Sequence, residues 1–484
     1  MKVLSTFAIV LVGVGVFARQ PGRAPTDSLN VLFIVSDDLN NDLGCYRGRA
    51  QTPHIDRLAA RGTRFDRAYC QFPLCNPSRS SFLSGRKPDA TKVMANPIGN
   101  RLSPSIRDAI PDTVTLPQLF KAAGRISARV GKLYHYGVPN HIGTASLDDW
   151  ASWDITVNPR GRDREVHDRI FSLVPGQFGA TLSWLAEESE DAEHTDGIGA
   201  AEAVKLLERF ARNREAFFLG VGFYRPHTPY VAPKKYFAMY PPERLALPEP
   251  SAADRAREPA GAFRNARKEQ DSMSDAQRRE AIQAYLASIS FMDAQVGVVL
   301  SALDRLQLTD RTVVVFTSDH GYHLGEHGLW QKMSLFEGSA RVPLIIAAPG
   351  AKARGRATAG LAELVDLYPT LAGLAGLSTP EYLDGVSLAP LLDNPEARVR
   401  DAAFTQIRNE GYAVRTDRWR YIEWAEGREG SQLYDMQRDP GETTNLAADP
   451  THAATVAELR ARLTRYRTTV RQAAAPGPTT RVGG

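Results

Sequence analysis

The sequence predicts an α/β protein built on a large, mostly parallel sheet with helices on both faces. The run NVLFIVSDD is continuously apolar and ends in two acids, which is typical of a strand buried on both faces of a parallel sheet. Helical segments with one apolar face alternate with further runs of this kind. Hydrophobic residues make up 43% of the 484 residues and charged residues 24%, so the chain has the composition of an ordinary globular protein.

The elements of this fold follow one another from the first strand onward. In TPHIDRLAARG, Thr52 is expected to cap a helix, Pro53 to occupy its first position and Gly62 to end it. Further strands are expected in RISARVG, AFFLGVGF, RTVVVFTSD and RVPLIIAAPG. Further helices are expected in AAEAVKLLERFARN, in residues 280–303 and in LAELVDLYPTLAGLAG. Residues 28–395 are therefore predicted to form one large α/β domain.

The pattern changes after about residue 395. AAFTQIRNEGYAVRTDRWRYIEW alternates between apolar and polar residues and contains turn residues, which predicts a small antiparallel sheet. A helix from about Thr455 to Arg467 is expected to pack on it. Residues 396–470 then form a C-terminal subdomain, and residues 471–484 are expected to be a disordered tail.

The N-terminal segment is typical of a secretory signal peptide over residues 1–18. Lys2 precedes an apolar run from Val3 to Phe17, and small residues follow at a suitable cleavage position. A membrane anchor is the alternative, but a spanning helix needs roughly 20 apolar residues. No later run is expected to reach that length, so we expect an exported protein, periplasmic or secreted, without stable membrane insertion. A net charge of +4 is too dilute for nucleic-acid binding.

Polar residues follow four of the predicted strands. In open α/β sheets, ligands bind beyond the carboxyl ends of the strands, so these residues are candidates for a common site. They are Asp37, Asp38, Lys132, His135, Arg225, His227, Asp319 and His320.

The acids in this set predict a metal site. Carboxylates about 4 Å apart repel each other by roughly 4 kcal/mol at an effective dielectric constant near 20, and a divalent cation removes this conflict. SDD alone is equally typical of a turn or a helix cap, but TSDHG repeats the acid-rich ending at a second strand. Oxygen ligands favour a hard cation such as Ca²⁺ or Mg²⁺.

Cations near these acids indicate a pocket for a tetrahedral anion. Arg79, Lys132 and Lys332 lie in predicted loops together with His135 and His227. A metal with several fixed cations would neutralise a sulfate or phosphate ester. Taken singly, each of these cations is more typical of a solvated surface charge.

The chain has three cysteines, Cys45, Cys70 and Cys75. In an exported protein an odd number leaves at least one cysteine unpaired or chemically special. One interpretation of Cys75 is half of a disulfide with Cys70.

A family resemblance gives another interpretation of Cys75. The sequence C-x-P-S-R, followed by Leu83, Gly85 and Arg86, resembles the signature of the type I sulfatases, in which the cysteine is oxidised to formylglycine. DDLNNDLGCY, VGKLYH, FYRPHTPY, TSDHGYHLGEHGLWQKMSLFEGSARVPLI and LYDMQRDPGETTNLA resemble the same family in the same order. Ser84 replaces the usual Thr, and Asn76 fills the variable position.

The resemblance implies an alkaline phosphatase-like fold and a site carried over residue by residue. In the iduronate 2-sulfatase-like branch, the metal ligands would be Asp37, Asp38, the modified Cys75, Asp319 and His320. The metal is expected to be Ca²⁺, with Mg²⁺ as the alternative, and a formylglycine-generating enzyme is an expected partner. Modification of Cys75 leaves Cys45 and Cys70 as an even pair, whose bonding is an open alternative.

The resemblance also implies a mechanism in which hydrated formylglycine attacks sulfur and later expels sulfate. Arg79 would hold the diol, while Lys132 and Lys332 grip the sulfate oxygens. His135 would take the proton of the second hydroxyl. We expect His227, as an imidazole titrating near neutrality, to protonate the leaving alcohol.

Three functions are compatible with the sequence. The first is hydrolysis of a sulfated saccharide, although LWQKMSLFEGSARVPL also resembles choline sulfatase. The second is phosphoester or phosphonate hydrolysis on the same fold. The third is a non-catalytic sulfated-glycan binding protein in which Cys75 stays a thiol.

Overall fold

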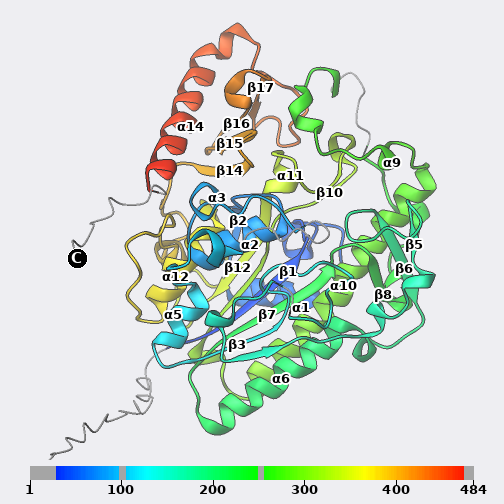
Figure 1. The fold of residues 1–484 in the computed structure, drawn as a ribbon, viewed down its shortest axis with the longest axis vertical. Helices are drawn as coiled ribbons and strands as arrows, with labels where there is room; N and C mark the ends of the chain where they lie inside the picture. Colours follow the sequence, from blue (N-terminus) through cyan, green and yellow to red (C-terminus); the bar gives the residue numbers. More distant parts are fainter. Residues whose placement is uncertain (1–28, 98–104, 146, 249–254, 474–484) are drawn as a thin grey trace, which may run out of the picture.

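The computed structural model describes residues 29–97, 105–145, 147–248 and 255–473, and its centre is one eight-stranded sheet (Figure 1). The expected signal peptide and residues 474–484 of the expected tail lie outside the described residues. In spatial order the strands are β13 (Arg356–Glu363), β2 (Thr63–Tyr69), β12 (Arg341–Ala347), β9 (Thr312–Ser318), β1 (Asn30–Asp37), β7 (Phe217–Pro226), β3 (Ile126–Gly131) and β4 (Ile155–Val157).

The sheet is mostly parallel, as the sequence predicts. Strand β1 pairs in parallel with β7 and with β9, and β3 pairs in parallel with β7. Strand β12, from the run RVPLIIAAPG, is antiparallel to both of its neighbours. The parallel centre brings the carboxyl ends of β1, β7, β9 and β3 to one edge of the sheet.

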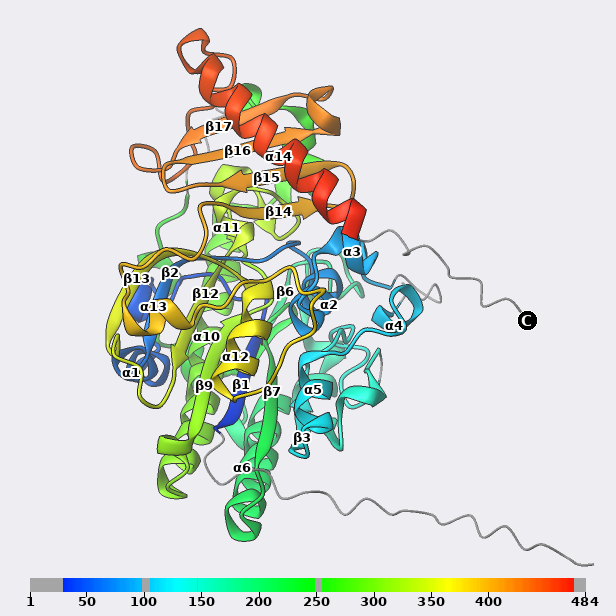
Figure 2. The same ribbon diagram turned by 90° about the vertical axis from the view of Figure 1, so that its left-hand side faces the viewer.

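Helices cover both faces of the sheet (Figure 2). Alternate residues of β1 point to opposite sides, so that Leu32 and Ile34 join one core cluster and Val31, Phe33 and Val35 the other. The first cluster includes residues of α1 (Pro53–Arg61), α6 (Thr195–Asn213) and α10 (Asp275–Arg305). The second includes residues of α2 (Cys75–Ser84), α5 (Leu116–Ala122) and α12 (Leu367–Leu374).

Shorter elements surround this core. A three-stranded sheet contains β5 (Phe171–Ser172), β6 (Ser183–Glu187) and β8 (Tyr230–Pro233), and a hairpin contains β10 (His323–Leu324) and β11 (Trp330–Gln331). The short helices include α3 (Pro88–Thr91), α4 (Ile106–Ala109), α7 (Lys234–Phe237), α9 (Lys268–Asp271), α11 (Glu337–Ala340) and α13 (Ala389–Asp393).

Arg79 lies in helix α2 and not in the expected loop, and the sequence pattern does not show this helix because all ten of its residues are buried. A helix without a solvent-facing side has no polar stripe and therefore no amphipathic periodicity. Helix α12 is shorter than expected, since the first residues of LAELVDLYPTLAGLAG complete the edge strand β13.

The expected cap of α1 is replaced by a tertiary contact. The Thr52 side chain makes no cap hydrogen bond and donates to Asp56 at 2.9 Å. The backbone N–H groups of His54 and Ile55 instead donate to Asp293 of α10, at 3.2 and 2.8 Å. A carboxylate from another helix therefore satisfies this N-terminus.

Helix α10 confirms the helix expected over residues 280–303 and extends it at both ends. Among the described residues it is the one helix long and apolar enough to cross a membrane, contrary to the expectation that no later run reaches that length. In its most apolar stretch, 83% of the residues are buried inside the protein. Packing against the sheet and α6 therefore accounts for its apolar composition.

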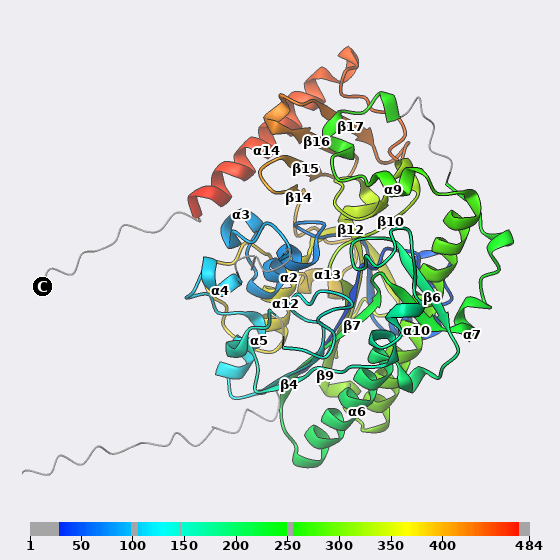
Figure 3. The ribbon, with the colours of Figure 1, turned by 45° about the vertical axis from the view of Figure 1, so that its right-hand side comes forward.

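The C-terminal segment forms the expected antiparallel sheet, with β14 (Ala403–Ile407), β15 (Gly411–Arg415), β16 (Trp419–Trp424) and β17 (Ser431–Asp435) (Figure 3). Helix α14 (Ala453–Ala473) packs on it and is longer than the expected helix. Leu459 and Leu463 of α14 share a core cluster with Tyr412 and Tyr421 of the sheet.

A buried ion cluster joins this sheet to α11. Arg420 of β16 pairs with Glu337 and lies 2.9 Å from a Glu442 carboxylate oxygen. Arg420 also donates to the Leu335 carbonyl at 3.0 Å, and the Glu337 N–H donates to Glu442 at 2.7 Å. The cluster therefore fixes the chain a few residues after Lys332.

Replacing Arg420 with Ala should destabilise the protein strongly, because Glu337 and Glu442 would lose their shared cation in the interior. The expected loss is about 3–5 kcal/mol in the free energy of unfolding, measured by urea denaturation. Arg418→Ala is the matched control, since Arg418 pairs with Asp435 but its side chain is 43% exposed. That control should change the free energy of unfolding by less than about 1 kcal/mol. Equal losses in the two variants would contradict this account.

Candidate active site

The register of the central strands brings the predicted acids together. Ser36 of β1 pairs with Ser318 of β9, so the residues that follow, Asp37 and Asp319, lie side by side at the edge of the sheet. Asp37 also pairs with Pro226 of β7, which places His227 next to it. The neighbouring strands β1, β7 and β9 therefore deliver the acids and one histidine to a single point.

Strand β3 adds Lys132 to this edge. Gly222 of β7 allows the close approach, since a Cβ at this position would lie 2.1 Å from the Lys132 carbonyl oxygen. The Lys132 N–H donates to the Gly222 carbonyl at 2.9 Å. The lysine side chain contacts Asp37.

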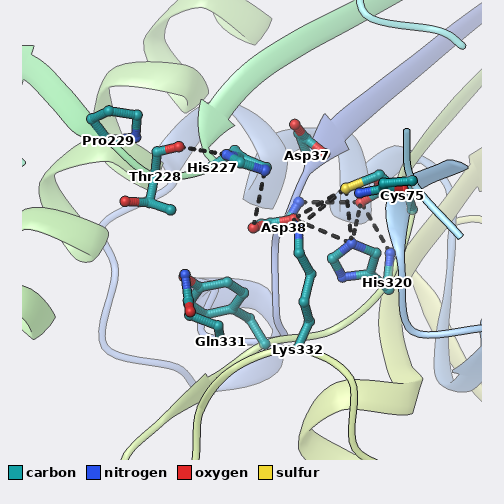
Figure 4. A network of polar contacts seen from close by, with 12 residues as sticks. Asp37, Asp38, Cys75, His227, Thr228, Pro229, His320, Gln331 and Lys332 are labelled. Atoms are coloured by element: carbon teal, nitrogen blue, oxygen red, sulfur yellow. Dashed lines mark hydrogen bonds and ion pairs between the residues drawn. The ribbon is translucent and has the colours of Figure 1, made fainter. Parts of the chain in front are cut away.

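Cys75, the first residue of α2, lies against the acids (Figure 4). Its Sγ is 3.4 Å from His320 Nε2 and 3.7 Å from Asp38 Oδ1. Lys332 Nζ lies 3.1 Å from the same sulfur and 2.5 Å from Asp38 Oδ1. All four of these residues are buried or nearly so.

The donor atoms of the five predicted metal ligands converge. Ligand atoms of Asp37, Cys75, Asp319 and His320 all lie within 4.8 Å of one another, and so do those of Asp37, Asp38, Cys75 and His227. Asp38 Oδ2 is buried and has no hydrogen-bond partner among the described residues. This oxygen-rich set with an orphaned carboxylate oxygen fits a divalent cation. His227 joins the second group, although the sequence pattern did not mark it as a ligand.

His320 is oriented as a metal ligand needs. Its Nδ1 lies 2.9 Å from the Gly321 carbonyl, which can only accept, so Nδ1 carries a proton and Nε2 faces the cluster. Burial lowers the pKa of His320, but the Asp319 and Asp38 carboxylates outweigh burial and raise the pKa well above its usual value. The cluster thus favours positive charge at this point.

Arg79 neutralises two of the acids. Its Nε donates to Asp319 at 2.9 Å and its Nη2 to Asp37 at 3.3 Å, while Nη1 donates to the carbonyls of Lys132 and Leu133. Burial opposes the charge of Arg79, yet the two carboxylates raise its pKa. No described hydrogen bond joins Arg79 to Cys75, so the contacts of Arg79 are with the acids.

The acids themselves stay ionised in the interior. Burial raises the pKa of Asp37, but the cations around it, Lys132 and Arg79 among them, outweigh burial and hold it well below its usual value. Burial likewise raises the pKa of Asp38, and the positive charge around it, including that of Lys332, outweighs burial, so that this pKa is also lowered.

His227 differs from the expectation of an imidazole titrating near neutrality. Burial lowers its pKa to about 3, so the ring is neutral at pH 7. Its Nδ1 lies 2.6 Å from the Thr228 carbonyl and therefore carries the proton. Its Nε2, 3.7 Å from Asp38 Oδ2, presents a lone pair to the site.

His135 is buried near the cluster but makes no hydrogen bond or ion pair with it among the described residues. Its Nδ1 has no partner there, and burial together with the Lys132 charge lowers its pKa well below the usual value. His135 is thus a neutral imidazole, and its catalytic role stays a prediction.

All three cysteines are free, so neither disulfide alternative is present. Cys70 is buried, with its Sγ 3.9 Å from the Ser339 carbonyl, and Cys45 is half-buried beside Asp56. These different surroundings keep the thiols apart and leave Cys75 as a single side chain at the acids.

Supporting residues were missed at the sequence level. Asp38 adopts a φ of 64°, in the left-handed region, which is strained for a residue with a side chain. Tyr285 of α10 donates to the Asp38 carbonyl at 2.8 Å and accepts from the Asn40 N–H at 2.9 Å. The one available signal was a hydroxyl on the otherwise apolar face of residues 280–303.

Arg225 supports His227 and does not enter the cluster. It pairs with Asp163 at 2.6 Å and donates to the His227 carbonyl at 2.7 Å. The polar residue that follows β7 at this position therefore fixes the loop that carries the histidine.

Comparisons with known proteins agree with this geometry. A family model described as Sulfatase matches residues 29–377, and a model described as N-sulphoglucosamine sulphohydrolase, C-terminal, matches residues 325–469. Iduronate 2-sulfatase of Mus musculus is 32% identical over 532 residues, covering 91% of this chain and 94% of that protein. Choline-sulfatase of Rhizobium meliloti is 33% identical over 445 residues, covering 88% of this chain and 83% of that protein.

The fold also has a solved counterpart. A phosphonate monoester hydrolase from Silicibacter pomeroyi superposes with a TM-score of 0.75 at 24% identity, covering 91% of this chain and 95% of that one. The mostly parallel sheet and its flanking helices therefore form an alkaline phosphatase-like hydrolase fold. The chain belongs to the sulfatase family, in its iduronate 2-sulfatase-like group.

Tyr285→Phe should weaken metal binding, because Asp38 would lose the hydroxyl that supports its strained backbone. The expected fall in Ca²⁺ affinity is about 10- to 100-fold, measured by calorimetry on chelator-treated protein. Tyr240→Phe is the matched control, since it removes a buried hydroxyl bonded to Ser290 and to the Gln51 N–H. Unchanged Ca²⁺ affinity in Tyr285→Phe would show that Asp38 needs no such support.

Proposed function

We propose that this sulfatase removes sulfate from a sulfated saccharide, with formylglycine made from Cys75 as the nucleophile and Ca²⁺, or alternatively Mg²⁺, as the metal. The single observation that supports the proposal best is the position of Cys75. Its Sγ lies within 3.7 Å of a carboxylate, an imidazole and an ammonium group in a buried cluster. A cysteine with a purely structural role would pack against apolar side chains and would not need these charged and polar neighbours.

Two groups would complete the site. A divalent cation held by Asp37, Asp38, Asp319, His320 and the modified Cys75 would supply Lewis-acid stabilisation of the negative charge on the nucleophile and on the sulfate. Formylglycine would supply two hydroxyls when hydrated, one to bond to sulfur and the other to eliminate sulfate and restore the aldehyde.

The chain's own cations fit the role of binding the sulfate group. Lys132 and Lys332 contact Asp37 and Asp38, so their ammonium groups are held at the cluster by charge. Burial lowers the pKa of Lys332, but Asp38 and the neighbouring acids outweigh burial and raise it. Lys332 is therefore permanently protonated and donates to a sulfate oxygen.

The two histidines carry the proposed proton transfers. A bound sulfate ester brings negative charge beside His227 and so raises the pKa of the ring, which takes a proton from water on Nε2. As the bond between sulfur and the ester oxygen breaks, that oxygen takes this proton from Nε2. His135 is neutral before reaction and accepts the proton of the second hydroxyl as sulfate leaves.

The remaining parts of the proposal concern the whole chain. We propose that residues 1–18 direct export to the periplasm or the outside of the cell, where sulfated polysaccharides occur. A formylglycine-generating enzyme would act on Cys75 before folding encloses it, because the side chain is fully buried afterwards. Residues 28–395 would form the catalytic domain and residues 396–470 its C-terminal subdomain.

Protein co-expressed with a formylglycine-generating enzyme should carry the aldehyde or its hydrate at Cys75 and hydrolyse sulfate esters. Mass spectrometry of the peptide that contains Cys75, together with sulfate release, checks this expectation. Cys75→Ser is the control and should lose turnover, because serine cannot eliminate sulfate from the covalent intermediate. Full turnover by an unmodified thiol would refute the nucleophile, and preference for phosphonate over sulfate esters would favour the phosphonate hydrolase alternative.

His227→Gln should lower kcat more for a saccharide sulfate than for an aryl sulfate. A sugar alkoxide is a poor leaving group that needs the proton, and general acid catalysis contributes about 10²- to 10⁴-fold. An activated phenolate leaves without help, so 4-nitrophenyl sulfate is the internal control. Steady-state rates on both substrates give the ratio, and an equal loss on both would assign His227 a role other than proton donation.

A further inference from the structure

A cavity lies beside the hairpin that leads to Lys332. It has a volume of about 320 Å³, and its lining includes Arg255, Gln270, Asp271, Arg278 and Trp330. Trp330 is followed by Gln331 and then by Lys332, so the cavity wall and the proposed sulfate-binding lysine are two residues apart. We call the set Arg255, Gln270, Arg278 and Trp330 the arginine pocket.

The arginine pocket is joined to the active site by side chains. Gln270 donates from Nε2 to Gln331 Oε1 at 2.9 Å. Gln331 precedes Lys332 in the chain, and both side chains appear in the close view of the cluster (Figure 4). Both glutamines are buried, and Gln331 has a φ of 68°, so this link holds a strained backbone next to the lysine.

The pocket's cations lack strong partners. Arg278 Nε is buried and has no hydrogen-bond partner among the described residues. The ion pair of Arg278 with Asp275 is 3.5 Å long and that of Arg255 with Asp271 is 3.7 Å long. Those two aspartates are 67% and 56% exposed, so water screens both pairs. An N–H without an acceptor is available to an oxygen of water or of a ligand, and the Arg278 side chain is 35% exposed, so a ligand can reach it.

The remaining wall suits a sugar ring. Trp330 is almost fully buried and lines the cavity, while Gln270 and the two arginines supply polar groups beside the Asp271 carboxylate. An apolar wall with fixed charged groups at the side is a combination that binds an acidic saccharide. Two guanidinium groups would repel a cationic alcohol such as choline.

We propose that the arginine pocket binds the carboxylate or sulfate of an acidic sugar adjacent to the one whose sulfate ester is cleaved. This inference rests on the proposed function and narrows its substrate to an acidic oligosaccharide. It also separates this chain from choline sulfatase, which the segment containing Lys332 resembles.

Arg278→Met tests the proposal, because it keeps the unbranched stem of the side chain and removes its charge and donors. On a sulfated disaccharide with an acidic neighbouring sugar, KM should rise about 10- to 100-fold, as expected for a lost hydrogen bond between charged groups. On the corresponding monosaccharide sulfate, kcat/KM should stay within about threefold. Arg305→Met is the matched control, since Arg305 lies at the other end of α10 and pairs with Glu208 on the surface.

Three further measurements separate the possible outcomes. A disaccharide with its carboxylate reduced to an alcohol shows whether carboxylate or sulfate is recognised, because only loss of the recognised group should imitate Arg278→Met. Calorimetry with the acidic disaccharide measures binding without turnover, so the pocket can be tested even if the proposed hydrolysis is absent. Urea denaturation of Arg278→Met should match the wild type. Equal KM values for wild type and variant on the acidic disaccharide, with equal calorimetric affinity, would overturn the proposal.

Discussion

Three aspartates are buried at one edge of the parallel sheet, and the surrounding structure must compensate their negative charge. Asp37, Asp38 and Asp319 are fully buried, and ionised carboxylates in a protein interior are unstable unless cations accompany them. Arg79 and two lysines provide that charge, and each comes from a different segment of the chain. The positions of these cations are therefore needed to stabilise the buried carboxylates, in addition to any part that they take in catalysis.

The same constraint explains the strained backbone around the site. Asp38, Gln331 and Met333 all have positive φ, and such conformations persist where surrounding contacts hold them. Tyr285 supports Asp38 from α10, and Asn265 donates to the Met333 carbonyl at 3.1 Å. Further along, the buried Arg420 cluster ties the same segment to the C-terminal sheet. The C-terminal sheet is thus connected to the site through the segment that carries Lys332.

Substrate choice follows from what surrounds this fixed centre. In the proposed function the charged cluster binds the sulfate group, which sulfated sugars and choline sulfate share, and so the cluster would not separate these substrates. The arginine pocket lies outside the cluster, and three of its four residues come from the segment 255–278. A conserved reaction centre with a variable wall is the arrangement that lets one fold serve several substrates.

The sequence by itself determined the α/β fold class, the antiparallel C-terminal sheet and the residues that converge at the strand ends. It could do so because buried strands are continuously apolar and their carboxyl ends meet at one edge of a parallel sheet. Only the tertiary structure decided the helical state of residues 75–84, the free state of the cysteines and the neutral form of His227. Complete burial explains why the sequence does not show helix α2, because a fully buried helix has no amphipathic pattern. Burial also explains the neutral form of His227, because it removes the water that would stabilise an imidazolium. The distances between the thiols depend on how segments remote in the sequence pack together. The contact of Tyr285 with Asp38 and the arginine pocket depend on the same packing, which the local sequence does not determine.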